Sequence, residues 1–404
     1  MTQKPELLAP AGDLECLRTA LRFGADAVYL GGPMLQLRAG TAGFSMQQLE
    51  EAVTITHSAG KRLYVTVNSF IKNGELPLLG DYARTLRDLC VDAVIVSDLG
   101  GICAIREAAP ELELHVSTQA NCLNWAAARH YYDMGAKRVI LGREATLEEI
   151  SELCSKKPAG LDIECFIHGA MCMSYSGRCL LSAYMNGRSG NRGDCSQPCR
   201  YRYSLLGDDG ETYPILEDGN GTMLLSSRDL NAMPFLDKLI DAGVTSLKIE
   251  GRMKSAYYVA TVVNAYRHRL DGIAPADFCL SELSCASHRE FTSGFFFGEA
   301  RSAPSAGAGY LQDCVFVAVV LGEKDGRYII EQRNHFSVGD RLELLSPDSM
   351  GLSFTVADLK TMEGESVSRA PHPQQKLSVT SPLKLSPGDI LRRRKQEPKS
   401  ENIP

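Results

Sequence analysis

The chain has 404 residues, 44% of them hydrophobic and 23% charged, an ordinary composition for a globular protein with a sizeable core. Its net charge of −6 excludes a general attraction to nucleic acid, so any such binding needs a local basic patch. There is no run of 18 apolar residues, and the opening MTQKPELLAPAGD has no long apolar region of the signal-peptide kind. We therefore expect a cytoplasmic protein without a membrane partner.

Eight short apolar runs follow one another with amphipathic segments between them. The runs begin at Glu6, Ala25, Arg62, Val91, Leu112, Lys137, Leu161 and Val244. Such runs are typical of strands buried on both faces, and SMQQLEEAVTITHSAG, with a Ser45 cap and an end at Gly60, is typical of the helices between them. The alternation predicts a TIM-like (β/α)8 barrel over residues 1–304, with a doubly wound sheet as the alternative.

The seventh and eighth predicted strands are separated by far more chain than the others. The excess, from about Met171 to Asp229, carries four cysteines and the glycine-rich stretch NGRSGNRGDCSQPCRYRY. An insertion that follows a barrel strand lies on the C-terminal face, where such barrels build their active sites.

After the barrel the pattern changes. Residues 305–395 contain short alternating segments such as CVFVAVVLG and DRLELLSP, separated by turn residues. They predict a small antiparallel β-barrel domain or sandwich. We expect the tail, residues 396–404, to be disordered.

The cysteines of the insertion follow the spacing C-x6-C-x15-C-x3-C. They are Cys172, Cys179, Cys195 and Cys199, out of 13 cysteines in a chain expected to lie where structural disulfides are rare. Structural zinc usually has two short knuckles, and only the second pair fits, whereas iron–sulfur clusters are also held by four thiolates. The spacing leaves zinc, an iron–sulfur cluster and no metal open.

Arginines and tyrosines crowd the same segment. Residues 171–204 hold Arg178, Arg188, Arg192, Arg200, Arg202, Tyr175, Tyr184, Tyr201 and Tyr203, against one acid, Asp194. Guanidinium groups bind phosphate and tyrosine rings stack on unpaired bases, so we interpret these residues as an RNA-binding collar. The alternative is an ordinary solvated face.

Polar residues follow several predicted strands. They are Asn68, Asp98, Gln119, Asn121, Arg143, His168, Glu250 and Arg252. Because parallel barrel strands end on one face, four of these side chains are expected to converge on one cavity: Asn68, Gln119, His168 and Glu250. The hydrolase signatures H-E-x-x-H and G-x-S-x-G and the P-loop are absent from the sequence.

One segment matches a family signature. ECFIHGAMCMSYSGRCLLS, Glu164 to Ser182, follows the pattern E-x-F-x2-G-[SA]-x-C-x4-G-x-C-x-x-S of the U32 peptidase-like family. The opening ELLAPAGDLECLRTALRFGADAVYLGG and the segment SLKIEGRMKS are also similar to that family. The resemblance covers roughly residues 5–395, and the C-terminal β domain resembles the extra domain of its tRNA-modifying branch.

The resemblance implies a [4Fe–4S] cluster on four cysteines, with zinc as the alternative metal. Cys172 and Cys179 match the signature cysteines, and Cys195 and Cys199 match the downstream pair of the tRNA-type members. Some relatives have a cysteine at the position that Asn231 occupies here. The fourth ligand is therefore less secure than the first three. A resident cluster also implies iron–sulfur assembly proteins as partners.

The function implied by the resemblance is oxygen-independent tRNA hydroxylation, forming 5-hydroxyuridine at the wobble position with prephenate as a co-substrate. Catalytic roles then fall to His168, Glu250 and Arg252. Substrate-binding roles fall to Asn68, Gln119, Lys248, Arg178, Arg188, Arg192, Arg200 and Tyr175. The alternatives are a U32-type, collagenase-like peptidase, a ribosomal RNA cytidine hydroxylase and a non-catalytic RNA-binding protein.

Overall fold

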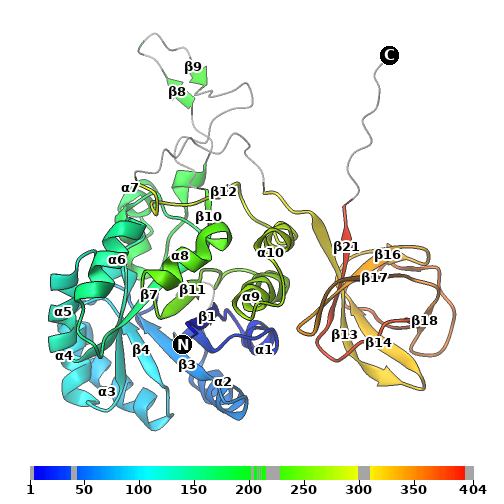
Figure 1. Ribbon diagram of the computed structural model, residues 1–404, viewed down its shortest axis with the longest axis horizontal. Helices are drawn as coiled ribbons and strands as arrows, with labels where there is room; N and C mark the ends of the chain where they lie inside the picture. Colours follow the sequence, from blue (N-terminus) through cyan, green and yellow to red (C-terminus); the bar gives the residue numbers. More distant parts are fainter. Residues whose placement is uncertain are drawn as a thin grey trace. The chain divides into compact units, whose positions relative to one another are not determined.

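The structure, a computed structural model, describes residues 4–37, 43–201, 204–206, 208, 210, 212–214, 228–298 and 310–395. These residues form two compact units (Figure 1). The barrel unit comprises the described parts of Met1–Leu21, Ala25–Ser255 and His288–Tyr310. The C-terminal unit comprises those of Arg22–Gly24, Ala256–Ser287 and Leu311–Pro404.

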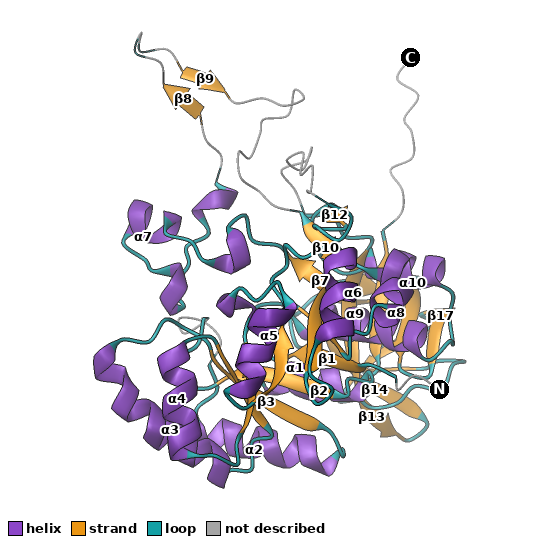
Figure 2. Ribbon diagram, turned by 60° about the vertical axis from the view of Figure 1, so that its left-hand side comes forward, coloured by secondary structure: helices purple, strands orange, loops and turns teal. Residues whose placement is uncertain are grey.

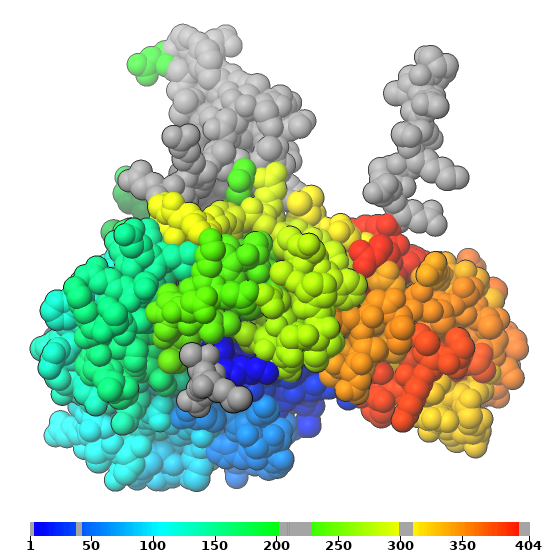
Figure 3. Space-filling model, in the orientation of Figure 1, coloured from blue at the N-terminus to red at the C-terminus, as the bar shows by residue number. Residues whose placement is uncertain are grey.

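The barrel unit contains a closed ring of eight parallel strands, so the predicted TIM-like architecture is confirmed. The strands are β1 (Glu6–Pro10), β2 (Ala27–Gly31), β3 (Arg62–Val67), β4 (Ala93–Val96), β5 (Glu113–Val116), β6 (Ala136–Ile140), β7 (Asp162–Ala170) and β11 (Ser246–Ile249). The ring closes because β11 pairs in parallel with both β1 and β7. Figure 3 shows this closure as dark-blue residues of the N-terminal segment beside bright-green residues from late in the barrel.

Helices surround the ring, as Figure 1 shows. They are α1 (Leu14–Arg22), α2 (Met46–Ser58), α3 (Leu76–Asp88), α4 (Leu99–Ala108), α5 (Trp125–Asp133), α6 (Leu147–Lys156) and α8 (Leu236–Asp241). The predicted Ser45 cap is present: the Ser45 hydroxyl accepts the Gln48 N–H at 3.2 Å, which satisfies one of the unpaired donors of the first turn of α2. Among the described helices, none has the length and apolar composition needed to span a lipid bilayer.

Charged side chains fill part of the barrel interior. Glu164 is fully buried and accepts hydrogen bonds from Arg138 at 3.1 Å and from Lys248 at 2.9 Å. Burial alone raises the pKa of Glu164, but the charges of Lys248 and Arg138 outweigh it, so that this pKa is lowered. The paired carboxylate holds Lys248 in the centre of the ring.

The end of β7 departs from regular geometry. Lys248 pairs with Phe166, but the next residue of β11, Ile249, pairs with His168, so β7 carries one extra residue, a β-bulge. Gly169 follows with φ +106°, and a Cβ there would lie 2.5 Å from the carbonyl oxygen of Glu250. Only glycine fits this close approach in that conformation.

The insertion after β7 holds several short elements. Single turns of 3-10 helix span Tyr175–Gly177, Gly190–Arg192 and Pro198–Arg200, α7 spans Leu181–Asn186, and β8 (Ser204–Leu206) pairs with β9 (Thr212–Pro214). Figure 2 shows α7 beyond the strand ends, apart from the helices around the ring. The chain then returns through β10 (Asp229–Asn231), which pairs antiparallel with β7 and parallel with β12 (Phe291–Thr292). We did not predict β10 or β12.

The C-terminal unit combines two helices with a seven-stranded antiparallel sheet. The helices are α9 (Ala256–Leu270) and α10 (Ala276–Leu283), and the sheet has the order β17-β16-β21-β13-β14-β20-β18. Its strands are β13 (Cys314–Lys324), β14 (Arg327–Gln332), β16 (Arg341–Ser346), β17 (Ser349–Thr355), β18 (Leu359–Thr361), β20 (Lys376–Val379) and β21 (Ile390–Arg394), beside a pair formed by β15 (Phe336–Ser337) and β19 (Arg369–Ala370). The predicted tail, residues 396–404, lies outside the described residues.

Candidate active site

A cavity of about 220 Å³ lies at the carboxyl ends of the barrel strands. Tyr29, Thr66 and Lys248 reach it from the strands themselves, and the insertion contributes the remaining wall. The apolar part of the lining includes Ile95, Ile140 and Phe166. The site therefore stands where a barrel of this class is expected to hold its ligand.

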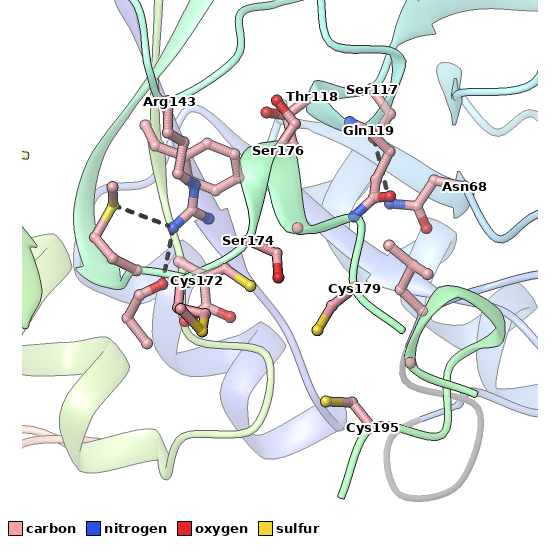
Figure 4. Close-up of a pocket in the computed structure, with 18 of the residues that line it drawn as sticks. Asn68, Ser117, Thr118, Gln119, Arg143, Cys172, Ser174, Ser176, Cys179 and Cys195 are labelled. Carbon is pink, nitrogen blue, oxygen red and sulfur yellow. Dashed lines mark hydrogen bonds between the residues drawn. The ribbon is translucent and has the colours of Figure 1, made fainter. Parts of the chain in front are cut away.

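All four cysteines of the insertion line this cavity. They are Cys172, Cys179, Cys195 and Cys199. Figure 4 shows the sulfur atoms of the three that it labels directed toward one another. Gly190 packs against Cys195, since a Cβ at position 190 would lie 3.3 Å from the Cβ of that cysteine. The sequence spacing thus identified side chains that the fold brings together.

Hydrogen bonds fix the segments that carry the cysteines. The buried Asn191 side chain accepts the Cys179 N–H at 3.2 Å and donates to the Cys179 carbonyl at 3.0 Å, which ties two parts of the insertion together. The Ser176 N–H donates to Glu144 at 2.6 Å, and its hydroxyl lies 2.7 Å from the side-chain oxygen of Asn121. These bonds attach the stretch between the first two cysteines to the barrel.

The chemistry of the donor set fits a group bound by thiolates. Cys179 Sγ accepts the Leu181 N–H at 3.3 Å, a hydrogen bond that stabilises negative charge on sulfur. The pKa of Cys199 is raised, chiefly by burial, and also by the negative charges of Cys172, Cys195 and Cys179 against the lowering effect of Arg200. Thiolates that repel one another in this way are stabilised by a bound cationic metal centre.

The thiols are not arranged around a single ion. Within the described ranges, no group of three or more His, Cys, Asp or Glu side chains is positioned to hold a metal ion. A four-iron cluster is held by thiolates that bind separate iron atoms. The residues fit such a cluster by donor type and by convergence on one cavity.

Three cationic side chains form another part of the lining: Arg143, Lys248 and Arg252. Arg252 is 6% exposed and donates to the Thr66 hydroxyl at 2.8 Å, and its other terminal nitrogen bonds to Gln36. Arg143 lies 3.7 Å over the ring of Phe166 and donates to the Ala170 carbonyl at 2.8 Å. Burial lowers the pKa of Arg143 and of Lys248, as expected for cations removed from water.

The predicted strand-end residues divide between the cavity and its surroundings. Asn68, Gln119, Glu250 and Arg252 line the cavity, as expected. His168 does not, so the expectation that it joins them is wrong. The β-bulge changes the alternation of side chains along β7, so Phe166 lines the cavity whereas His168 packs against Phe291 with ring centroids 5.6 Å apart.

Two arginines of the predicted collar are already paired with acids. Arg188 contacts Asp194 at 2.7 Å, and Arg192 contacts Glu75 at 2.6 Å. For Arg188 and Arg192, these ion pairs favour the alternative interpretation, an ordinary solvated surface, over an RNA-binding role. Arg202 and Tyr203 lie outside the described residues.

Three other collar residues lie close to the barrel mouth. Arg200 lines the cavity and bonds to the Gln197 side chain. Arg178 donates to the Gln119 carbonyl at 2.7 Å, and Tyr175 is 52% exposed. An exposed ring beside a cavity offers a face on which a base can stack.

Sequence reasoning missed some lining residues. Tyr29, Thr66 and Glu144 all line the cavity. Tyr29 and Thr66 lie inside apolar runs, where nothing in the pattern marks them as cavity residues. Glu144 follows the predicted strand-end residue Arg143 directly, and that position was the available signal.

The fold and the site define a (β/α)8 barrel whose mouth is covered by a four-cysteine insertion. The chain belongs to peptidase family U32. The profile of that family matches residues 12–305, and the profile of the U32 C-terminal domain matches residues 312–392.

Three relatives indicate the activities found in the family. The chain is 37% identical over 407 residues to tRNA hydroxylation protein P1 of Bacillus subtilis, with 98% of this chain and 96% of the relative covered. It is 40% identical to the 23S rRNA 5-hydroxycytidine C2501 synthase of Escherichia coli over 66% of this chain and 39% of the relative. It is 28% identical to a protein named collagenase from Porphyromonas gingivalis over 96% of this chain and 97% of the relative.

Proposed function

We propose that the protein is an RNA hydroxylase that acts on tRNA in the cytoplasm and forms 5-hydroxyuridine at the wobble position. The observation that carries the proposal is the convergence of four thiols and four cationic side chains on one small cavity at the barrel mouth. Two RNA hydroxylation proteins among the relatives support it, one of them over nearly the whole chain.

The proposed cofactor is a [4Fe–4S] cluster held by Cys172, Cys179, Cys195 and Cys199. Replacing C5–H of uracil by C5–OH requires an oxygen donor and an acceptor for two electrons, and a cluster held by these thiols would supply one-electron redox chemistry beside the base. The N–H of Leu181 and the cation of Arg200 favour the thiolate forms of the ligands. Zinc is the alternative metal.

We propose prephenate as the co-substrate and Arg143, Lys248 and Arg252 as the source of its binding energy. Prephenate carries two carboxylates, and buried guanidinium groups bind carboxylates strongly. Arg252 is 6% exposed and Lys248 is 4% exposed, so their charges are shielded little by water. Glu250 lines the same cavity and is the remaining catalytic candidate for moving a proton.

The chain's own residues would bind and orient the base. A target base must leave its stack to reach a cavity of this kind. The exposed Tyr175 offers a ring for stacking at the rim, and Phe166, Ile95 and Ile140 offer apolar contacts inside. The insertion residues that line the cavity would limit the access of water to the reacting carbon.

Mass spectrometry of tRNA nucleosides tests this function. A deletion strain should lack 5-hydroxyuridine and regain it with the wild-type gene, whereas Glu250→Gln should restore several-fold less. Normal hydroxyuridine in the deletion strain would contradict the proposal. Loss of 5-hydroxycytidine from ribosomal RNA instead would favour the rRNA activity, and full tRNA binding with unchanged nucleosides in every strain would favour a non-catalytic role.

A peptidase is the second candidate, favoured by the family's name and by the relative named collagenase. Its test is incubation of the purified protein with collagen peptides before and after removal of metal. Cleavage that survives mutation of the four cysteines but is lost with Glu250→Gln would support a peptidase at the same cavity.

A further inference from the structure

Gln119 is a buried amide that lacks a partner at the cavity. Its side chain lines the cavity and the residue is 5% exposed. Its Oε1 has no hydrogen-bond partner among the residues that the structure describes. A buried carbonyl oxygen left without a donor costs free energy, so an orphaned acceptor on a residue that lines a cavity points to a ligand that brings an N–H or O–H.

The backbone holds Gln119 in place from both sides. It is the middle residue of a single 3-10 turn, Thr118–Ala120, whose cap Ser117 accepts the Gln119 N–H at 3.3 Å. The Gln119 carbonyl accepts the side chain of Arg178 at 2.7 Å. The residue thus links the end of β5 to the segment that carries Cys179.

A glycine makes room for the amide itself. Gly177 has φ +73°, and a Cβ at that position would lie 2.7 Å from the Nε2 of Gln119. A larger residue in the cysteine-bearing segment would therefore displace the amide. The position of Gln119 depends on the same stretch of chain that joins the first two cysteines.

A second acceptor lies beside the first. Asn68 Nδ2 donates to the Ser117 hydroxyl at 3.4 Å, and Asn68 Oδ1 also has no partner within the described part of the chain. Figure 4 shows Asn68 and Gln119 together on one side of the cavity and Arg143 on the other. The cavity therefore has a side that accepts hydrogen bonds and a side that is cationic.

The size and lining of the cavity select the kind of donor. Its volume of about 220 Å³ is below the roughly 300–1,000 Å³ typical of pockets for drug-sized ligands, so each group that enters it must be small. Phe166, Ile95 and Ile140 provide apolar surface for the faces of a ring. A flipped nucleobase has apolar faces and hydrogen-bonding edges, and enzymes read such edges inside a pocket.

We propose that Gln119 determines base specificity by accepting the N3–H of the target uracil through its Oε1, with Asn68 as a neighbouring acceptor. This inference rests on the proposed function, since it names the part of the substrate that the cavity reads. With N3–H directed at Gln119, the C5 edge of the base points away from this acceptor wall into the remainder of the cavity. The role is one of recognition and positioning, because Gln119 takes no part in the redox step.

Binding of an anticodon stem-loop RNA with uridine or 3-methyluridine at the wobble position tests the proposal. The methyl group removes the N3–H donor and leaves the rest of the base intact. Wild-type protein should bind the uridine RNA about 10- to 100-fold more tightly, the range expected when a buried acceptor loses its donor. Gln119→Leu should bind both RNAs with similar, weaker affinity.

Gln332→Leu is the matched control. Gln332 is 2% exposed, and its Oε1 likewise has no partner in the described chain, but it lies on β14 of the C-terminal unit. This variant should keep the wild-type preference for uridine, and all three proteins should contain the same iron. A Gln119→Leu protein that unfolds or loses iron would make Gln119 a structural residue and overturn the proposal.

The outcomes separate this inference from the function on which it rests. If the wild type restores hydroxyuridine in cells but binds both RNAs equally, the inference fails and the hydroxylase stands. If Gln119→Leu discriminates as the wild type does, the inference fails in the same way. If the wild type restores no hydroxyuridine, both fail together.

Discussion

His168 and Phe166 stand two residues apart on β7, yet only Phe166 lines the cavity. The pKa of His168 is lowered to about 3, chiefly by burial and also by the nearby charges of His288 and Lys254, against the raising effect of Asp229. The imidazole is therefore neutral at pH 7 and is held among β7, β10 and β12 by packing. Its surroundings favour a structural role over the catalytic role predicted from its position at a strand end.

The lowered pKa of His168 predicts a pH dependence of stability. Unfolding restores an ordinary pKa of about 6.5, so the unfolded chain binds one more proton at this residue between pH 6.5 and 3. The contribution to stability is complete above pH 6.5 and is lost as the pH falls, by up to about 1.4 kcal/mol per pH unit. Urea unfolding at pH 7 and pH 5 should therefore show a smaller loss for His168→Gln than for the wild type, and an equal loss would contradict the assignment.

The sequence predicts that Arg188 and Arg192 bind RNA, but the structure pairs them with Asp194 and Glu75. Glu75 lies 117 residues before Arg192 in the chain, and no local pattern in the insertion announces an ion pair of that range. The four cysteines, by contrast, were found from their spacing in the sequence, and the fold brings all four to one cavity. Local residue type therefore predicted the thiols, and only the fold could show which arginines are already neutralised.

Arg192→Gln should leave RNA binding nearly unchanged. Its charge is paired with Glu75, so removing it should not reduce the slope of log affinity against log salt by the roughly 0.7 to 0.9 expected for a lost phosphate contact. Stability should fall by no more than about 1 kcal/mol, since the pair is partly exposed. Salt titrations of tRNA binding check this, with Arg200→Gln at the cavity as the comparison. A slope that is reduced only for Arg192→Gln would show that Arg192 does contact a phosphate.

At the scale of elements, the insertion is a set of short turns held to the barrel by side chains. Asn231 lies on β10 opposite His168, at the end of the insertion. Its side chain accepts the Met233 N–H at 3.0 Å. Cys199, in contrast, lines the cavity with the other three cysteines. This geometry favours Cys199 over position 231 as the fourth ligand.

Iron analysis of anaerobically prepared variants checks the fourth ligand. Cys199→Ala should lose most of its iron and visible absorbance, because three thiolates hold a cluster poorly. Adding Asn231→Cys to that variant should not restore them, since residue 231 does not line the cavity. Full recovery of iron in the double variant would show that the insertion rearranges and that Cys199 is replaceable.

The elements that could be predicted are the long or periodic ones. All eight barrel strands and the Ser45 cap follow from apolar runs and start signals in the sequence. The strands β10 and β12 have only three and two residues, too few for any alternation to be recognised. The bulge in β7 is also invisible locally, because it depends on the close approach of Gly169 to Glu250.

At the scale of the whole molecule, the compact units do not follow the predicted boundary at residue 304. The helices α9 and α10 form one unit with the C-terminal strands. Asn264 of α9 donates to the Ser346 carbonyl at 3.3 Å, and Glu282 of α10 binds the fully buried Arg392 of β21 at 2.7 Å. A linear pattern of strands and helices could not reveal this grouping, which depends on contacts far apart in sequence.

The Glu282–Arg392 pair should be essential to the C-terminal unit. Both side chains are almost wholly buried, and Arg392 also contacts Glu343 at 3.1 Å, so removal of Glu282 leaves the buried cation with one of its two acid partners. Breaking a buried pair outright costs about 3–5 kcal/mol, which is the upper bound for this loss. Glu282→Gln should therefore lower the free energy of unfolding by several times more than Arg394→Gln, whose side chain is 44% exposed. Chemical denaturation followed by circular dichroism makes the comparison, and equal losses would mean that water or a rearrangement compensates the buried charge.

The course of the chain between the two units has a consequence for inheritance. Apart from Arg22–Gly24, which group with the C-terminal unit, the polypeptide passes from the barrel unit to the C-terminal unit at residue 256, returns at 288 and leaves again at 311. A single recombination event at the end of the barrel would therefore remove the sheet of the C-terminal unit but leave α9 and α10 behind. The faces of these two helices that the sheet covers would then be exposed. Gene shuffling can exchange such a unit cleanly only as a set of separate segments, because α9 and α10 must move with the sheet.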